Sequence, residues 1–349
     1  MIDHLTKISC LALIFVISVP SYSDDNDEFD TINKNPHLDV LLKTKLENYQ
    51  QLYPDITFLN LKGGNQLVAD MLKLGNVLGH EPVSLDYEHP PELRKDLMYV
   101  SMNRILLMLQ YSIPSSALFK TDEELESQST VCVLTINPQA IASDSIQATE
   151  NLLGMPHEFV SNIPPDMHIG STDYLAYVID HEVYHCLQPI YVGPQPMSKK
   201  SLWGGYWHHL SELGADAYAL IMNIKNRGKI TSFAINVNRI RGCALLTADP
   251  NHLTCKAIEK INKIPPDQIS SLNEKEAFDL ALETRNKLTM THDEYLQFIS
   301  SAVEAMRQLD VDADLTEEES TVIRRVEADP KQVKALIKRT RKCFAELGG

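Results

Sequence analysis

The 349-residue chain has little positive charge: 32 lysines and arginines stand against 47 aspartates and glutamates, giving a net charge of −15. Binding to nucleic-acid phosphates needs lysine and arginine on a surface, so the deficit argues against a nucleic-acid partner. The hydrophobic content of 44% and the charged content of 23% are ordinary for a globular protein. The length allows a sizeable core and favours about two domains.

Other features are missing as well. Beyond the N-terminus, no stretch is both apolar enough and long enough to cross a membrane, so the sequence predicts no transmembrane segment in the mature chain. No two cysteines have the CxxC spacing, which argues against a structural zinc–thiolate site. No internal repeat with a fixed period is visible.

The N-terminus has the pattern of a secretory signal. Lys7 precedes the apolar run 8–19, and small residues follow at Ser21 and Ser23. This predicts a signal peptide at residues 1–23, cleaved after Ser23, and an exported protein that is periplasmic or secreted. The alternative is an uncleaved membrane anchor, for which the apolar run is short.

Removal of the signal leaves five cysteines, and an oxidising compartment favours disulfides between them. Cys243 and Cys255 flank the short loop 247–252, so we expect them to pair. A bridge between Cys132 and Cys186 is also possible, but nothing in the sequence supports it. The odd number leaves a free thiol or an intermolecular bridge.

Apolar periodicity predicts a fold that is α+β and mainly α-helical, with a small sheet. β-branched residues predict a strand at 130–136 and a shorter one at 56–61. Gln188 and Pro189 are expected to end the helix that begins near Thr172. The expected helices are 36–53, 92–111, 172–187, 206–226, 255–261, 274–288, 292–309 and 317–347.

The helix at 172–187 contains an HExxH motif, formed by His181, Glu182 and His185. Residues four apart lie on one face of a helix, so both imidazoles can reach the same metal ion. Glu182 follows His181 directly and can touch a water molecule on that metal without being a ligand. This arrangement is typical of a zinc hydrolase.

A catalytic zinc needs a third protein ligand. Gln188 and Tyr191 stand where the metzincin arrangement requires glycine and histidine, so that arrangement is excluded. The next helix carries Glu212 and, four residues later, Asp216 among small apolar residues. We expect Glu212 to bind the metal and Asp216 to accept the second N–H of a ligating histidine. The alternative is a solvated acidic edge, but two carboxylates on a buried face need a partner.

These motifs resemble those of the gluzincin zinc metallopeptidases over residues 172–220. The resemblance implies a zincin-like core with two metal-binding helices, one zinc ion per chain, and Glu182 as the general base. The gap between the two motifs is longer than in the thermolysin-like branch, so the family within the group stays open. The matching residues are His181, Glu182, His185, Glu212, Ala215 and Asp216.

The oxyanion of a tetrahedral intermediate needs a further donor. Tyr206, His208 and His209, at the start of the second helix, are the candidates. The alternative is that these residues and the neighbouring tryptophans form an aromatic packing cluster. His157, His168 and His252 lie in loop-like sequence and are expected to be surface histidines. The strand 130–136 is a candidate edge for an extended peptide substrate, with an interior strand as the alternative.

The sequence thus predicts an exported zinc metallopeptidase that acts on a peptide or protein substrate. The expected parts are an N-terminal helical part of the catalytic unit at 24–125, the metal-binding core at 126–228 and a C-terminal helical region at 229–349. The alternatives are a zinc hydrolase of a non-peptide substrate and a non-catalytic helical binding protein that keeps the motif. The oligomeric state stays open.

Overall fold

The computed structural model describes residues 35–79, 83–84, 94–121, 130–193, 201–313 and 317–348. The expected signal peptide at 1–23 lies outside these residues. Residues Asn35–Gly349 group into one compact unit. In the described part of the chain, no helix is both long and apolar enough to span a lipid bilayer.

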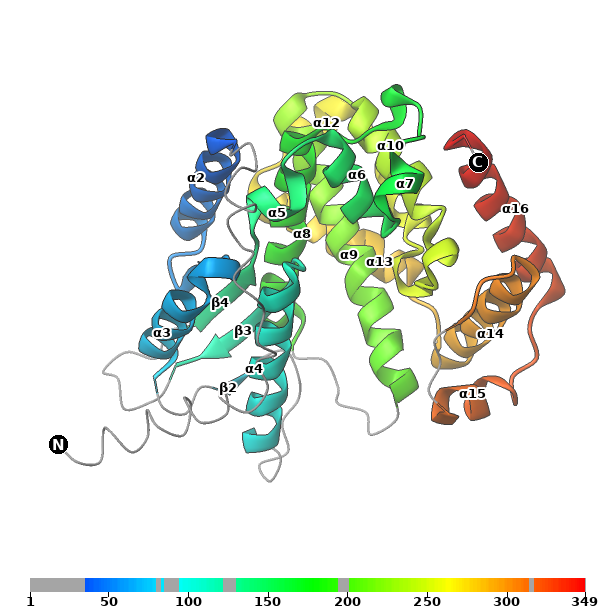
Figure 1. The fold of residues 1–349 in the computed structure, drawn as a ribbon, viewed down its shortest axis with the longest axis horizontal. Helices are drawn as coiled ribbons and strands as arrows, with labels where there is room; N and C mark the ends of the chain where they lie inside the picture. The colour runs from blue at the N-terminus through cyan, green and yellow to red at the C-terminus, as the bar shows by residue number, and fades with distance from the viewer. Residues whose placement is uncertain are drawn as a thin grey trace. The chain divides into compact units, whose positions relative to one another are not determined.

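The unit contains a small mixed sheet of four strands in the order β1-β4-β3-β2 (Figure 1). β1 and β4 are parallel, with Ile56 opposite Thr130, and β3 is antiparallel to both β4 and β2. The expected strand at 130–136 is confirmed as β4, but it lies inside the sheet, so its assignment as an edge is wrong. The strands are β1 (Ile56–Leu61), β2 (Val83–Ser84), β3 (Ser116–Lys120) and β4 (Thr130–Thr135).

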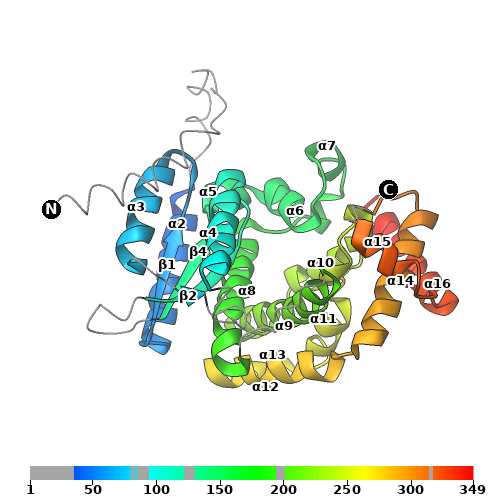
Figure 2. The same cartoon turned by 90° about the horizontal axis from the view of Figure 1, so that it is seen from below.

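Alternation along β4 divides the core into two layers, because successive side chains of a strand point to opposite faces. Val131 and Val133 pack with the apolar residues of α3 (Leu67–Leu78) and α4 (Arg94–Tyr111). Cys132 and Leu134 pack in the larger cluster with α2 (Pro36–Leu52) and α8 (Ser171–Val192). The HExxH helix therefore lies directly on one face of the sheet, between the sheet and α9 (Ser201–Arg227), as Figure 2 shows.

The helix α8 is longer than its sequence pattern indicates. It continues through Pro189 and ends at Gly193, whose backbone N–H donates to the carbonyl of Pro189. Proline removes one backbone donor and disfavours the preceding turn, yet α8 continues through it to Val192. The prediction that Gln188 and Pro189 end the helix is wrong by about one turn.

The helix α9 packs against α8 more closely than larger residues would allow. A Cβ atom at Gly214 would lie 2.0 Å from the hydroxyl of Tyr184, which is itself fully buried. Glycine is thus required at this crossing, and Tyr184 is a core residue. The contact fixes the spacing between the two helices that carry the expected metal ligands.

Short helices follow the sheet and a C-terminal series packs beyond α9 (Figures 1 and 2). The helix expected at 317–347 is divided near Pro330 into two helices, because Asp329 caps a new helix whose first residue is Pro330. The remaining helices are α5 (Pro138–Ala142), α6 (Ser145–Leu153), α7 (His157–Val160), α10 (Ser232–Arg241), α11 (Cys255–Ile261), α12 (Pro266–Ser270), α13 (Glu274–Leu288), α14 (His292–Gln308), α15 (Glu317–Ile323) and α16 (Pro330–Glu346).

Two disulfides link distant elements. Cys132 of β4 pairs with Cys186 of α8, and Cys243, just after α10, pairs with Cys343 of α16. The expected bridge between Cys243 and Cys255 is wrong: Cys255 is a free, buried thiol near the carbonyl of Asn238. The true partner is 100 residues away in the sequence, so only the packing of α16 reveals it.

Candidate metal centre

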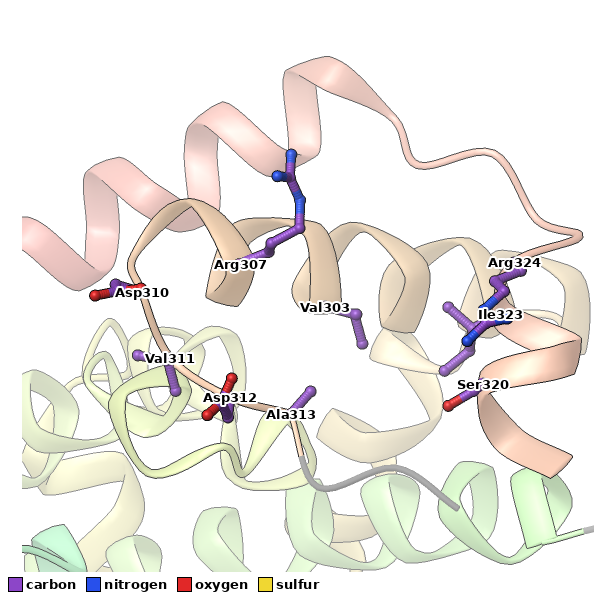
Figure 3. Close-up of a pocket in the computed structure, with 9 residues that line it drawn as sticks. All are labelled: Val303, Arg307, Asp310, Val311, Asp312, Ala313, Ser320, Ile323 and Arg324. Atoms are coloured by element: carbon purple, nitrogen blue, oxygen red, sulfur yellow. The ribbon is translucent and has the colours of Figure 1, made fainter. Parts of the chain in front are cut away.

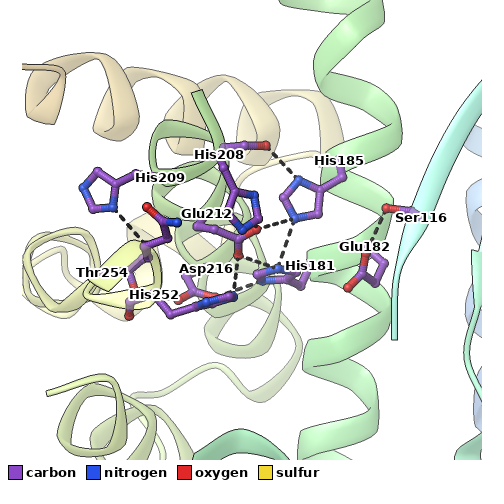
Figure 4. A network of polar contacts seen from close by, with 12 residues as sticks. Ser116, His181, Glu182, His185, His208, His209, Glu212, Asp216, His252 and Thr254 are labelled. Atoms are coloured by element: carbon purple, nitrogen blue, oxygen red, sulfur yellow. Dashed lines mark hydrogen bonds and ion pairs between the residues drawn. The ribbon is translucent and has the colours of Figure 1, made fainter. Parts of the chain in front are cut away.

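The face of α8 that meets α9 brings together the expected metal ligands (Figure 4). The Nε2 atoms of His181 and His185 lie 3.1 Å apart. Glu212 of α9 lies opposite them, with Oε2 3.0 Å from His181 Nε2 and Oε1 3.3 Å from His185 Nε2. Among the described residues, these three form a group whose ligand atoms all lie within 4.8 Å of one another.

The orientation of His185 is fixed by two residues behind it. Its Nδ1 lies 2.8 Å from the hydroxyl oxygen of Ser211, which donates its proton to Gln188 Oε1 at 2.7 Å. A hydroxyl has only one proton, so Ser211 accepts the second bond from Nδ1–H of His185. The lone pair of neutral His185 is therefore on Nε2, directed at the group.

Asp216 lies behind His181, with Oδ1 2.9 Å from Nδ1 of His181, although the angle of this contact is poorer than that of a regular hydrogen bond. A carboxylate can only accept, so Nδ1 carries the proton and Nε2 offers its lone pair to the group. Asp216 thus occupies the place that the sequence predicts for it.

Asp216 is fully buried and is itself held by other elements. Tyr177 of α8 and Thr254 donate hydroxyl protons to it, and Arg241 of α10 lies 2.9 Å from Oδ2. Burial raises the pKa of Asp216, but Arg241 and His181 lower it more and hold it well below the usual range. The carboxylate is therefore ionised and orients His181.

The donor set fits a divalent cation. Two imidazole lone pairs and an ionised carboxylate converge on one point. Among the described residues, no hydrogen-bond donor of good geometry reaches Oε2 of Glu212. Burial lowers the pKa of His181, but Glu212 and Asp216 raise it more, to about 10. The group thus attracts positive charge, which a proton or a metal ion can supply. Two histidine nitrogens and one glutamate oxygen are one of the ligand sets that catalytic zinc takes in proteins.

Glu182, the expected general base, lies beside this group on α8. Its side chain is buried and turned toward the sheet, where the hydroxyl of Ser116 on β3 donates to Oε2 at 2.8 Å (Figure 4). The sequence did not indicate Ser116. Ser116 is the first residue of β3 and lies opposite Leu134 of β4.

A further histidine reaches the site from outside the two helices. His252 Nε2 lies 3.1 Å from Glu212 Oε2, while its Nδ1 is hydrogen-bonded to Asp249. Burial lowers the pKa of His252, but Glu212 and Asp249 raise it more, to about 9. His252 is not a member of the compact ligand group, so it lies beside the ligands rather than among them. The prediction that His252 is a surface histidine is therefore wrong.

We call residues 242–254, which link α10 to α11, the α10–α11 segment. In it, His252 contacts Glu212, Thr254 contacts the supporting carboxylate of Asp216, and Asp249 contacts His252. The sequence does contain a signal for the turn in this segment: Asp249 precedes a proline and caps the short turn that ends at His252. That signal predicts the turn, but not its position beside α9.

The expected oxyanion donors have different surroundings. The hydroxyl of Tyr206 donates to the carbonyl of Met290, away from the ligands. His209 is buried against Phe298, and its Nδ1 lies 2.9 Å from the backbone oxygen of Asn251. Packing therefore accounts for these two residues. His208 is half-exposed, with Nδ1 3.5 Å from Glu212 Oε1, and remains at the site.

The C-terminal helices contain a separate open pocket of about 340 Å³ between α14 and α15 (Figure 3). Its charged lining residues are Arg307, Asp310, Asp312 and Arg324, so neither sign of charge dominates. Arg307 also pairs with Glu304. None of the residues that line this pocket belongs to the metal centre.

The metal centre thus joins α8, α9 and the α10–α11 segment around Glu212, with Glu182 and Ser116 at the sheet side. Comparisons of this chain with protein-family models, with curated proteins and with solved structures find no match.

Proposed function

We propose that the protein is a zinc-dependent metallopeptidase of gluzincin type, with a zincin-like core, that acts outside the cytoplasm. The observation that carries the proposal is the convergence of His181, His185 and Glu212, each held by a group behind it or beside it. The two buried disulfides are compatible with export.

His181, His185 and Glu212 would hold the zinc ion. When bound, zinc supplies a Lewis acid that activates water and polarises a carbonyl group. Glu182 takes a proton from the attacking water and delivers it to the leaving amine. The hydroxyl of Ser116 holds the carboxylate of Glu182 on the sheet side of α8.

His252 is the donor that stabilises the oxyanion. Asp249 accepts from Nδ1–H, so Nε2 also carries a proton only in the doubly protonated imidazole, and in that form Nε2–H lies 3.1 Å from Glu212 Oε2. His208, which is more exposed and lies farther from Glu212, is the weaker candidate. Tyr206 and His209 have no such role in this proposal.

The test compares Glu182→Gln with Glu212→Ala in the protein loaded with zinc. Glu182→Gln should keep one zinc ion per chain and lose about 100- to 10,000-fold in kcat for peptide hydrolysis, because the general base is gone. Glu212→Ala should lose zinc. Absence of zinc from the wild-type protein would overturn both the metal and the peptidase proposals. Bound zinc without hydrolysis of any peptide in a diverse library would overturn the peptidase alone.

A further inference from the structure

The α10–α11 segment is held in place by a helix of the C-terminal region. We propose that Asn251 and Tyr295 are positioning residues that fix His252 beside the metal centre, which makes α14 part of the active site. The inference rests on the proposed function, because it concerns how the oxyanion donor is presented. It assigns a role to a residue of α14, Tyr295, that lies 44 residues beyond Asn251 in the sequence.

Asn251 precedes His252 directly and contacts two other elements. Its backbone oxygen lies 2.9 Å from Nδ1 of His209 on α9. Its side-chain oxygen accepts a hydrogen bond from the hydroxyl of Tyr295 on α14, at 3.2 Å. The residue that carries the imidazole is thus attached to two helices by the residue before it.

Both contacts come from side chains with little freedom to move. His209 and Tyr295 are each about 2% exposed. The ring of His209 stacks on Phe298 at 5.3 Å, and the ring of Tyr295 contacts Tyr206 at 5.4 Å. Buried rings in fixed rotamers make hydrogen bonds that hold a loop in one position.

The tyrosine hydroxyl approaches α9 where that helix has no side chain. A Cβ atom at Gly205 would lie 2.7 Å from the hydroxyl of Tyr295. Glycine at this position therefore lets α14 come close enough for the hydroxyl to reach Asn251. The approach explains how a C-terminal helix reaches a loop beside the metal ligands.

The rest of the segment is attached on the opposite side. Asp249 binds both the backbone N–H and the ring of His252, and Thr254 donates to Asp216. The imidazole is thus oriented by Asp249, while the position of the turn depends on Asn251. Catalysis is sensitive to displacements of about 1 Å, so loss of the Tyr295 bond should lower turnover without removing any reacting group.

The test is Tyr295→Phe, with Tyr206→Phe as the matched control. Both changes delete one hydroxyl from the same aromatic cluster, but the hydroxyl of Tyr206 donates to Met290 rather than to the segment. Tyr295→Phe should lower kcat about 3- to 10-fold, the factor expected for one lost hydrogen bond. KM and zinc content should stay within about two-fold of wild type for both variants, and kcat as well for the control.

A double-mutant cycle with His252→Ala shows whether Tyr295 acts through the histidine. Adding Tyr295→Phe to His252→Ala should leave kcat unchanged, because no imidazole remains to be positioned. A second loss equal to that in the wild-type background would overturn the proposal, and so would an unchanged kcat in Tyr295→Phe alone.

Hydrogen–deuterium exchange separates this inference from the proposed function. In the zinc-loaded protein, backbone amides of residues 249–254 should exchange faster in Tyr295→Phe than in Tyr206→Phe. If the wild type hydrolyses no peptide, the proposed function fails, and the exchange rates still decide whether Tyr295 holds the segment. Equal rates in the two variants would contradict the positioning role whatever the activity.

Discussion

The pair of helices α8 and α9 and the α10–α11 segment approach the same carboxylate in different ways. The helices present His181, His185 and Glu212 by regular spacing, on long elements that the core holds in place. The segment presents His252 from two short 3-10 turns, and Ala248 between them has a positive φ of 54°. Its position depends on individual side-chain hydrogen bonds, so we expect metal binding to depend on the helices and turnover on the segment.

The largest expected effects distinguish metal binding by the helices from turnover that depends on the segment. Glu212→Ala should abolish zinc binding, because a metal ligand is lost. His252→Ala should keep zinc and lower kcat about 100- to 1,000-fold, the usual loss for one oxyanion donor. Metal analysis by atomic emission, beside steady-state kinetics, checks both. Loss of zinc in His252→Ala would make His252 a ligand and remove the distinction between the two regions.

A large loss of stability is expected when the surroundings of Asp216 are changed, because this carboxylate of α9 also contacts the α10–α11 segment. Arg241→Met leaves a fully buried carboxylate without its cation and should lower the free energy of unfolding by about 3–5 kcal/mol. Arg239→Met is the control, since Arg239 is more exposed and lies 3.7 Å from Glu346 at the surface. Urea unfolding of both variants measures the difference. Similar losses would mean that burial of Asp216 does not depend on Arg241.

The two disulfides allow the regions to be loosened separately. Chain entropy assigns about 4 kcal/mol to the loop of 54 residues and about 5 kcal/mol to the loop of 100, and measured losses are typically about 2–4 kcal/mol. Cys132→Ala with Cys186→Ala should weaken zinc binding, because Cys186 follows His185 directly. Cys243→Ala with Cys343→Ala should lower kcat instead, because Cys243 lies at the start of the α10–α11 segment.

Zinc titration and kinetics on the two double variants provide the measurement. If both pairs weakened zinc binding equally, the segment would contribute to metal affinity as much as the helices do.

The same comparison explains how much could be predicted from the sequence. His181, Glu182, His185, Glu212 and Asp216 were all brought into one place as expected, because helical spacing fixes which residues share a face. The mainly helical fold with a small sheet was predicted for the same reason.

What the sequence did not reveal depends on contacts between distant elements. The approach of His252 to Glu212, the pairing of Cys243 with Cys343 and the bond from Ser116 to Glu182 join different elements. No local spacing encodes them. The interior position of β4 likewise depends on which strands lie beside it.

The smallest expected effect compares one hydroxyl from each region. Ser211→Ala removes the acceptor for His185 Nδ1 and should weaken zinc binding about 10-fold, at the low end for residues that support a ligand. Thr254→Val removes a donor from Asp216, which keeps Tyr177 and Arg241, so zinc affinity should change less than about three-fold. Competition with a zinc chelator measures both dissociation constants. A larger loss in Thr254→Val than in Ser211→Ala would mean that the segment orients His181 more strongly than α9 orients His185.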